Sequence, residues 1–176
     1  MPRDEVASPQ PALLGFLMLH PAHPYELNQE FDRELGRVWR VGQSHLYAHL
    51  SRLEESGYAT VAAEAQAGRP ARKVYRITPS GKKLFLEWLR APTERVRDIR
   101  LELLARLYFY DRMRLPGLAG LAAGQKALLE SRVASLDCGV AEAKDGFSRL
   151  VLDFRRSEIE AIIRWLDRCV EEAEWK

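Results

Sequence analysis

The chain has 176 residues, of which 47% are hydrophobic and 30% are charged, as in a soluble globular protein with room for one ordinary domain or two small ones. No stretch approaches the run of about 18 apolar residues that a transmembrane helix needs. The N-terminal stretch has acidic residues where a secretory signal needs basic ones, so we expect a cytoplasmic protein. The net charge is only +2, but residues 37–83 sum to +6 and the remainder to −4. This asymmetry predicts one region that faces a polyanion.

Three helices are predicted in the first third of the chain, after a short arm. Residues 1–10 are polar and lack periodicity, which predicts a flexible arm. An apolar run that opens at Pro11 predicts the first helix, because proline suits the first position of a helix. Residues 24–35 place an apolar side chain at every fourth position and predict the second helix. The third is expected over residues 42–57, with its final glycine as the C-terminal cap.

A β-hairpin and four more helices are predicted to follow. Residues 58–65 and 72–78 contain β-favouring side chains and are separated by a turn with glycine and proline. Thr78 followed by Pro79 indicates a helix start, because threonine caps a helix and proline fits its first position. That helix ends before Pro92. Beyond it there is no strand signal, and helices are predicted over residues 95–113, 118–144 and 147–175.

This order of elements predicts a mainly α fold with a small β-hairpin. Three helices followed by a two-stranded hairpin form a winged helix-turn-helix, in which the third helix enters the DNA major groove. We expect such a domain over residues 11–91. Residues 92–176 are expected to form an antiparallel helical dimerisation domain that could also hold an effector. A partner chain is the simplest cover for two long helices that cannot bury both of their sides alone.

The predicted third helix carries an unusual set of polar side chains. With an advance of about 100° per residue, the residues that face the core are Leu46, Leu50 and Leu53. Those that point away are the small residues Ser44, Ala48 and Ser51. The residues beside this outward strip are Tyr47, His45 and Arg52. Small residues let a helix approach a groove closely, and the flanking side chains can hydrogen-bond to phosphates or base edges.

Two other interpretations of this helix stay open. The polar side could be an ordinary solvated face, although its place between a helix-turn-helix pair and a basic hairpin argues against this. His45 and His49 are four residues apart, as metal ligands on a helix can be. No Cys, Asp or Glu constellation surrounds them, so we expect no metal site.

The predicted hairpin is basic near its tip, where Arg69, Arg72 and Lys73 cluster. Such a group matches a wing that contacts phosphates, with a solvated charge run as the alternative. The sequence has no nucleophile elbow, P-loop or dinucleotide fingerprint, so we expect neither an enzyme nor a cofactor. Cys138 and Cys169 do not have the spacing of a metal-binding cysteine motif, and they are expected to be reduced thiols.

Three blocks of the sequence resemble the PadR-type transcriptional regulators. They cover residues 13–89 and read LLGFLMLHPAHPYELNQEF, LYAHLSRLEESGY and GRPARKVYRITPSGKKLFLEWL. A weaker likeness over residues 96–112 extends to the helical tail of the longer members. The resemblance implies a homodimer held by the C-terminal helices, with two winged-helix domains that read a pseudo-palindromic operator. It also implies repression that is relieved by a small aromatic or apolar molecule.

The resemblance also implies roles for individual residues. By position, Tyr47 would contact the DNA backbone or bases, and Arg72 and Lys73 would contact phosphate. The chain departs from the family pattern where it matters most for sequence preference. Ala48 stands where a proline is common, and His45 stands where a small hydroxyl residue is usual. The operator sequence therefore cannot be transferred from relatives.

We predict a dimeric repressor that binds double-stranded DNA and no membrane. Its DNA contacts are expected to come from Tyr25, Gln43, Ser44, His45, Tyr47, Ser51, Arg52, Arg69, Arg72 and Lys73. An effector pocket is expected to include Trp88, Tyr108, Phe109, Phe154 and Trp165, although aromatic residues at helical spacing also suit a plain core. The rival hypotheses are a winged-helix protein-interaction module that never binds DNA, and an effector-sensing activator with the same fold.

Overall fold

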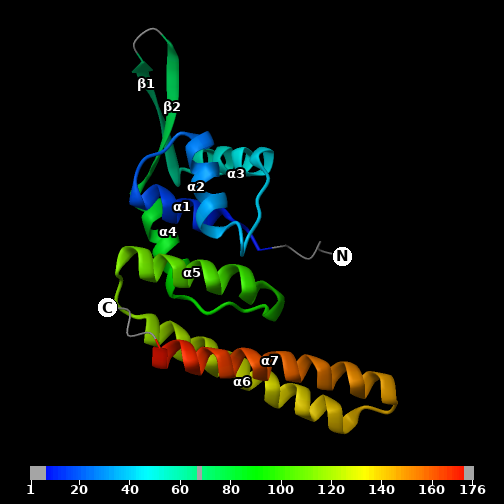
Figure 1. Ribbon diagram of the computed structural model, residues 1–176. Coiled ribbons are helices and arrows are strands. Elements are labelled where there is room, and N and C mark those ends of the chain that lie inside the picture. Colours follow the sequence, from blue (N-terminus) through cyan, green and yellow to red (C-terminus); the bar gives the residue numbers. More distant parts are fainter. Residues whose placement is uncertain (1–6, 67–68, 173–176) are drawn as a thin grey trace. The chain divides into compact units, whose positions relative to one another are not determined.

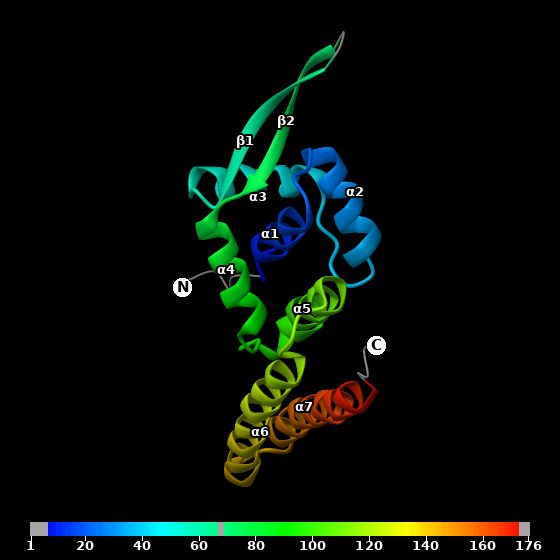
Figure 2. The same cartoon turned by 90° about the vertical axis from the view of Figure 1, so that its left-hand side faces the viewer.

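The computed structural model describes residues 7–66 and 69–172, and Figures 1 and 2 show its helices and strands. By its internal contacts the chain divides into two compact units, called unit 1 and unit 2 below. Unit 1 comprises Met1–Arg90 and Asp98–Arg114, and unit 2 comprises Ala91–Arg97 and Leu115–Lys176. Helices dominate both units, and the strands of the described residues form a two-stranded sheet. The predicted mainly α fold with a small hairpin is confirmed.

Unit 1 begins with three helices whose ends are set by local capping. They are α1 (Gln10–Leu19), α2 (Pro24–Leu35) and α3 (Gln43–Glu55). At the start of α2, the Tyr25 N–H donates to His23 Nδ1 at 3.1 Å, and the His23 N–H donates to the Glu26 carboxylate at 3.4 Å. After α3, Gly57 adopts a φ of +71°, which favours glycine and ends the helix. Residues 1–6 of the expected arm lie outside the described residues.

The wing of unit 1 is the antiparallel hairpin of β1 (Ala59–Gln66) and β2 (Arg69–Ile77). β2 also pairs with the connection between α1 and α2 along its other edge. The Tyr75 N–H donates to the Ala22 carbonyl at 2.9 Å, and the Ala22 N–H donates to the Tyr75 carbonyl at 3.2 Å. In both views the strands extend well beyond α2 and α3 (Figures 1 and 2). The base of the wing is therefore fastened to the connection between α1 and α2.

The helix α4 (Pro79–Arg90) follows the wing directly. Its start is capped as predicted, since the Thr78 hydroxyl accepts a hydrogen bond from the Gly81 N–H at 3.1 Å. The same hydroxyl donates to the Gly57 carbonyl at 2.8 Å. One threonine thus joins the end of the wing to the end of α3 and sets the direction in which α4 leaves.

The helix α5 (Ile99–Met113) groups with unit 1, after a short 3-10 turn, η1 (Val96–Asp98). Arg106 on α5 is almost fully buried, and its Nε donates to the Trp88 carbonyl at 2.8 Å. Its guanidinium carbon also lies 4.7 Å from the centre of the Trp88 ring. The division by contacts therefore differs from the boundary expected at residues 91–92, because α5 packs with the winged helix.

Gly15 on α1 marks a close approach in the aromatic core of unit 1. The rings of Phe16 and Phe85 each pack against Phe109 with centroids 5.2 Å apart. A Cβ atom added at Gly15 would lie 2.5 Å from Phe109 Cζ and 2.7 Å from Phe85 Cε2. These ring carbons belong to fully buried side chains and have little room to move.

The Gly15→Ala variant is expected to lose stability. Overpacking of a well-filled core costs roughly 1–3 kcal/mol, more than the modest gain in helix propensity from glycine to alanine. The control is Gly124→Ala on a helix of unit 2, where an added Cβ meets nothing within 4 Å. Urea unfolding should show a lower midpoint for the first variant and an unchanged or higher one for the second. Equal midpoints for both would contradict the close packing at Gly15.

Unit 2 is built on two long antiparallel helices, α6 (Leu118–Glu142) and α7 (Gly146–Glu172), which lie side by side in Figure 1. Their shared core includes Leu121, Leu129, Ile159 and Leu166. Two ion pairs link the helices across their exposed edges. Lys126 Nζ lies 2.6 Å from Asp167 Oδ1, and Arg156 Nε lies 3.0 Å from Asp137 Oδ1.

A buried glutamine joins α6 to the segment at residues 91–97. The Thr93 N–H donates to Gln125 Oε1 at 2.6 Å, and Gln125 Nε2 donates to the Thr93 carbonyl at 3.1 Å. Gln125 is fully buried and Thr93 nearly so. The oxygen and the nitrogen of the side-chain amide are each hydrogen-bonded to the backbone of one residue, which offsets part of the cost of burying them.

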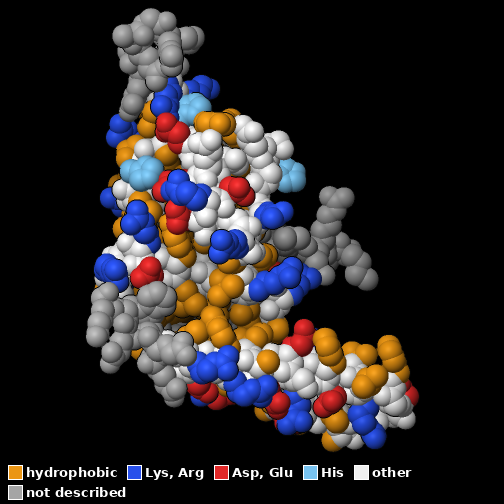
Figure 3. Space-filling view, viewed as in Figure 1, with side chains coloured by type: hydrophobic (Ala, Val, Ile, Leu, Met, Phe, Trp, Pro, Cys, Tyr) orange, Lys and Arg blue, Asp and Glu red, His pale blue; other side chains and the backbone are white. Residues whose placement is uncertain are grey.

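The first half of α7 carries an exposed hydrophobic surface, the α7 apolar patch, formed by Phe147, Leu150, Val151 and Phe154. Phe147 is 76% exposed and Phe154 is 63% exposed. Hydrophobic side chains are visible at this end of unit 2 in Figure 3. Among the described residues, no helix combines the length and hydrophobicity that crossing a lipid bilayer requires.

Candidate nucleic-acid interface

The two faces of α3 lie as the helical periodicity predicts. Leu46, Leu50 and Leu53 are buried and hold the helix against the core of unit 1. The small residues Ser44, Ala48 and Ser51 are exposed. Inward leucines and an outward strip of small side chains are therefore confirmed. Contact of this strip with DNA stays a prediction.

The side chains that flank the strip are also accessible. Gln43, His45 and Arg52 are exposed, and Tyr47 is 37% exposed. His49 lies nearer the core, and its burial lowers the pKa of the imidazole, helped by the nearby charges of Arg52 and His45. The neutral form of His49 is therefore favoured, as for a side chain at the edge of the core.

Tyr25, at the start of α2, presents a second exposed aromatic ring to solvent and is 50% exposed. Gln29 Nε2 donates to the Tyr25 hydroxyl oxygen at 2.8 Å. This bond occupies the oxygen as an acceptor and leaves the hydroxyl hydrogen available to a phosphate oxygen. Gln29 was not among the predicted site residues. Gln29 lies four residues after Tyr25 on the same face of α2, and this spacing could have indicated the hydrogen bond between them.

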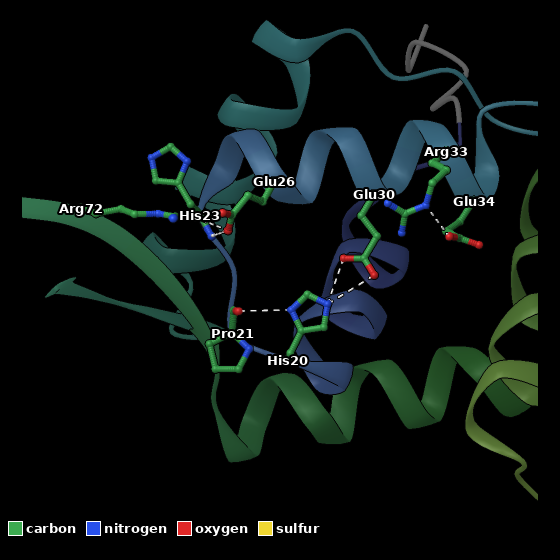
Figure 4. A network of polar contacts seen from close by, with 8 residues as sticks. All are labelled: His20, Pro21, His23, Glu26, Glu30, Arg33, Glu34 and Arg72. Carbon is green, nitrogen blue, oxygen red and sulfur yellow. Dashed lines mark hydrogen bonds and ion pairs between the residues drawn. The ribbon is translucent and has the colours of Figure 1, made fainter. Parts of the chain in front are cut away.

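The three predicted wing residues differ in how exposed they are and in what they contact. Lys73 is exposed. Arg72 is only 29% exposed and forms an ion pair with Glu26, at the start of α2 (Figure 4). The backbone of Arg69 lies at the start of β2, and its side chain lies outside the described residues. Glu26 was not predicted, and its partner on the distant wing cannot be read from the local pattern.

Figure 4 also shows polar contacts of His20, at the connection between α1 and α2. His20 Nε2 lies 3.1 Å from a Glu30 oxygen, and its Nδ1 lies 3.2 Å from the Pro21 carbonyl oxygen.

The hydrogen bond from Arg72 holds the pKa of Glu26 below its usual value, against a smaller opposing effect of burial. Glu26 therefore stays ionised and paired at neutral pH.

A second contact fixes the wing against α3. The Tyr75 hydroxyl donates to Glu54 Oε2 at 3.4 Å. Burial raises the pKa of this hydroxyl, and the Glu54 carboxylate adds to the increase, so the tyrosine remains a donor. The exposed strip of α3 and the exposed side of β2 are thus held together within unit 1.

The predicted effector residues fall into both units. Trp88, Tyr108 and Phe109 meet in unit 1, where the ring centre of Phe109 is 6.4 Å from Trp88 and 5.1 Å from Tyr108. Burial raises the pKa of the Tyr108 hydroxyl to about 12. Phe154 and Trp165 belong to α7 in unit 2, and Phe154 is part of the α7 apolar patch. A shared pocket for these five residues stays a prediction.

No group of His, Cys, Asp or Glu side chains within residues 7–66 and 69–172 is arranged to hold a metal ion. Cys138 on α6 is exposed and Cys169 on α7 is half-buried, and both are free thiols. Around the outward face of α3, the described part of unit 1 offers exposed hydrogen-bonding side chains together with the positive charges of Arg52 and Lys73. Such a surface suits a nucleic acid.

Comparison with known proteins agrees with this chemistry. The family model described as "Transcriptional regulator PadR-like family" matches residues 13–87. The probable transcriptional regulator Rv1176c of Mycobacterium tuberculosis is 30% identical over 178 residues, which cover 91% of this chain and 94% of that protein. The negative transcriptional regulator PadR of Bacillus subtilis is 29% identical over 98 residues, 56% of this chain but only 54% of the relative.

A solved structure has the same fold. The crystal structure of Bacillus subtilis PadR in complex with operator DNA aligns with a TM-score of 0.50 and 21% identity. The alignment covers 96% of this chain and 99% of that one. At this level of identity the likeness concerns the fold, a winged helix-turn-helix followed by C-terminal helices.

Proposed function

The chain belongs to the PadR-like family of transcriptional regulators, and from this premise we propose that it is a homodimeric repressor that binds double-stranded operator DNA. The family consists of transcriptional regulators and not of enzymes. The observation that carries the proposal is the exposed face of α3, where Ser44, Ala48 and Ser51 form a narrow strip between hydrogen-bonding side chains.

In the proposed complex, α3 lies in the major groove with its strip of small residues against the base edges. Gln43 and His45 near its start contact bases, while Tyr47 and Arg52 contact bases or backbone. Lys73 from the wing contacts phosphate as a point charge. Tyr25, oriented by Gln29, donates its hydroxyl hydrogen to a phosphate oxygen. Phosphate contacts set the position of the domain, and the start of α3 sets its sequence preference.

The proposed dimer is formed by the C-terminal helices. A second copy of the chain covers the α7 apolar patch, since an exposed hydrophobic surface of this kind is unfavourable in a free monomer. A two-fold symmetric dimer presents two α3 helices to half-sites about 34–36 Å apart, which requires a pseudo-palindromic operator.

Repression and its relief are further parts of the proposal. The Bacillus subtilis relative is named a negative regulator, which supports repression by this chain. A small aromatic or apolar molecule is proposed to relieve it. The support is the cluster of Trp88, Tyr108 and Phe109, where the Trp88 indole N–H is buried without a hydrogen-bond partner among the described residues.

Selection of genomic DNA by the purified protein tests the proposal and yields the operator. Replacing Lys73 with glutamine should weaken binding to every DNA and make the salt dependence of log K shallower by about 0.9 for each protomer. The control is Lys83→Gln, which removes the same charge from an exposed lysine on α4 and should change neither quantity. If the wild-type protein retains no genomic fragment at moderate salt, the protein-interaction module is the better hypothesis.

A further inference from the structure

The wing is fastened to the rest of unit 1 at a small number of points near its base. Nearest the base, Tyr75 exchanges two backbone hydrogen bonds with Ala22. Further along β2, Arg72 pairs with Glu26. Both strands extend well beyond α2 and α3 (Figures 1 and 2). Of these two contacts between described residues, the ion pair lies farther from the base of the wing, so it acts with the longer lever arm when it restrains the angle of the wing.

Glu26 is well placed to serve as a fixed anchor. Its carboxylate also accepts the His23 N–H of the capping box, so its position is set by its own helix. Arg72, in contrast, belongs to the wing itself, where it lies opposite Glu64 of β1. Its side chain is 29% exposed, whereas the neighbouring Lys73 is exposed to solvent. Much of the charge of Arg72 is thus already engaged within the protein.

We propose that Glu26 positions the wing for DNA by holding Arg72, so that Arg72 affects DNA binding through Glu26 and is not itself a phosphate ligand. This inference rests on the proposed function. It changes the role that the family resemblance implies for Arg72, and it adds Glu26 as a positioning residue. The phosphate contact at this part of the wing is left to Lys73.

The two roles for Arg72 predict opposite effects when Glu26 is neutralised. If Arg72 were a phosphate ligand, Glu26 would compete with DNA for it, and its removal would strengthen binding. If Glu26 orients the wing, its removal frees the strand and weakens binding, because the wing must then be ordered when DNA binds. The sign of the change therefore separates the two roles.

The variant Glu26→Gln is suited to this test, because glutamine at the third position of a helix keeps the capping box. Glu26→Gln and Arg72→Gln should each weaken DNA binding by about two- to fivefold, the range of a partly exposed ion pair. The double variant should bind DNA no more weakly than whichever single variant binds more weakly, because both changes remove the same ion pair. Arg72→Gln should also leave the salt dependence unchanged, unlike Lys73→Gln.

The control is Glu87→Gln, which removes the same charge from an exposed ion pair with Lys83 on α4 and should leave binding unchanged. Tighter or unchanged binding of Glu26→Gln, additive losses in the double variant, or a salt dependence shallower by about 0.9 in Arg72→Gln would each overturn the proposal.

Amide hydrogen exchange separates this inference from the proposed function. It is measured on the protein without DNA, so it applies even if the chain bound no DNA. In Glu26→Gln and Arg72→Gln, the amides of β2, including the Tyr75 N–H that is bonded to Ala22, should exchange faster than in the wild type and in Glu87→Gln. Unchanged exchange along β2 would show that the ion pair does not hold the wing, and would overturn the positioning role.

Discussion

An Ala48→Glu variant is expected to lose operator binding by more than about 100-fold, which corresponds to about 2.7 kcal/mol. Ala48 lies in the middle of the exposed strip of α3, between Ser44 and Ser51. A glutamate there adds a methylene and a carboxylate group, with its negative charge, where the helix should approach the base edges. Both the bulk and the repulsion from the phosphates oppose entry into the groove. Because Ala48 is exposed, the fold should not be affected.

The matched control at the same position is Ala48→Ser, which keeps the side chain small and neutral. Its affinity should stay within a few-fold of the wild-type value, and its sequence preference should be measured in the same selection. Circular dichroism and urea unfolding of both variants check that the fold is retained. A folded Ala48→Glu variant that still binds the operator tightly would show that α3 is not the element that enters the groove.

A Phe154→Asp variant is expected to be monomeric and to lose operator affinity by on the order of 100-fold, because the two half-sites no longer act together. Phe154 is 63% exposed and lies in the α7 apolar patch. A carboxylate in the middle of a hydrophobic interface would lose its hydration without gaining a partner. The exposure of Phe154 in the single chain means that the monomer should fold normally.

Sedimentation equilibrium measures the dimer directly, and binding to a half-site and to a full operator measures its consequence. The control is Arg155→Gln, which changes the charge by the same amount at an exposed position next to the patch. That variant should remain a dimer. If Phe154→Asp is still a dimer at micromolar concentration, another surface holds the two copies together.

The helices of unit 1 and their capping could be predicted because the causes are local. Pro24 and Thr78–Pro79 start helices for reasons of backbone geometry, and Gly57 ends one because it accepts a positive φ. The inward side of α3 follows from the spacing of its leucines. The exposed strip of Ser44, Ala48 and Ser51 is the other consequence of that spacing, so most of the candidate site could also be predicted.

The contacts that give individual site residues their roles could not be predicted in this way. Arg72 and Lys73 are adjacent basic residues on one strand, and the sequence alone gives no reason to expect different partners for them. In the fold one of them pairs with Glu26 on α2 while the other is exposed. The Ala22–Tyr75 bridge likewise joins the connection between α1 and α2 to the wing. These contacts join segments whose partners no local pattern specifies.

The sequence by itself determined the order of the elements, the mainly α class and the two sides of α3, because periodicity and capping act between residues a few positions apart. Only the tertiary structure decided that α5 packs with the winged helix, since Arg106 reaches the carbonyl of Trp88 on α4. It also decided that Arg72 is held by Glu26. These contacts join residues that are far apart in the sequence, and which of them meet is decided only when the folded chain packs its core.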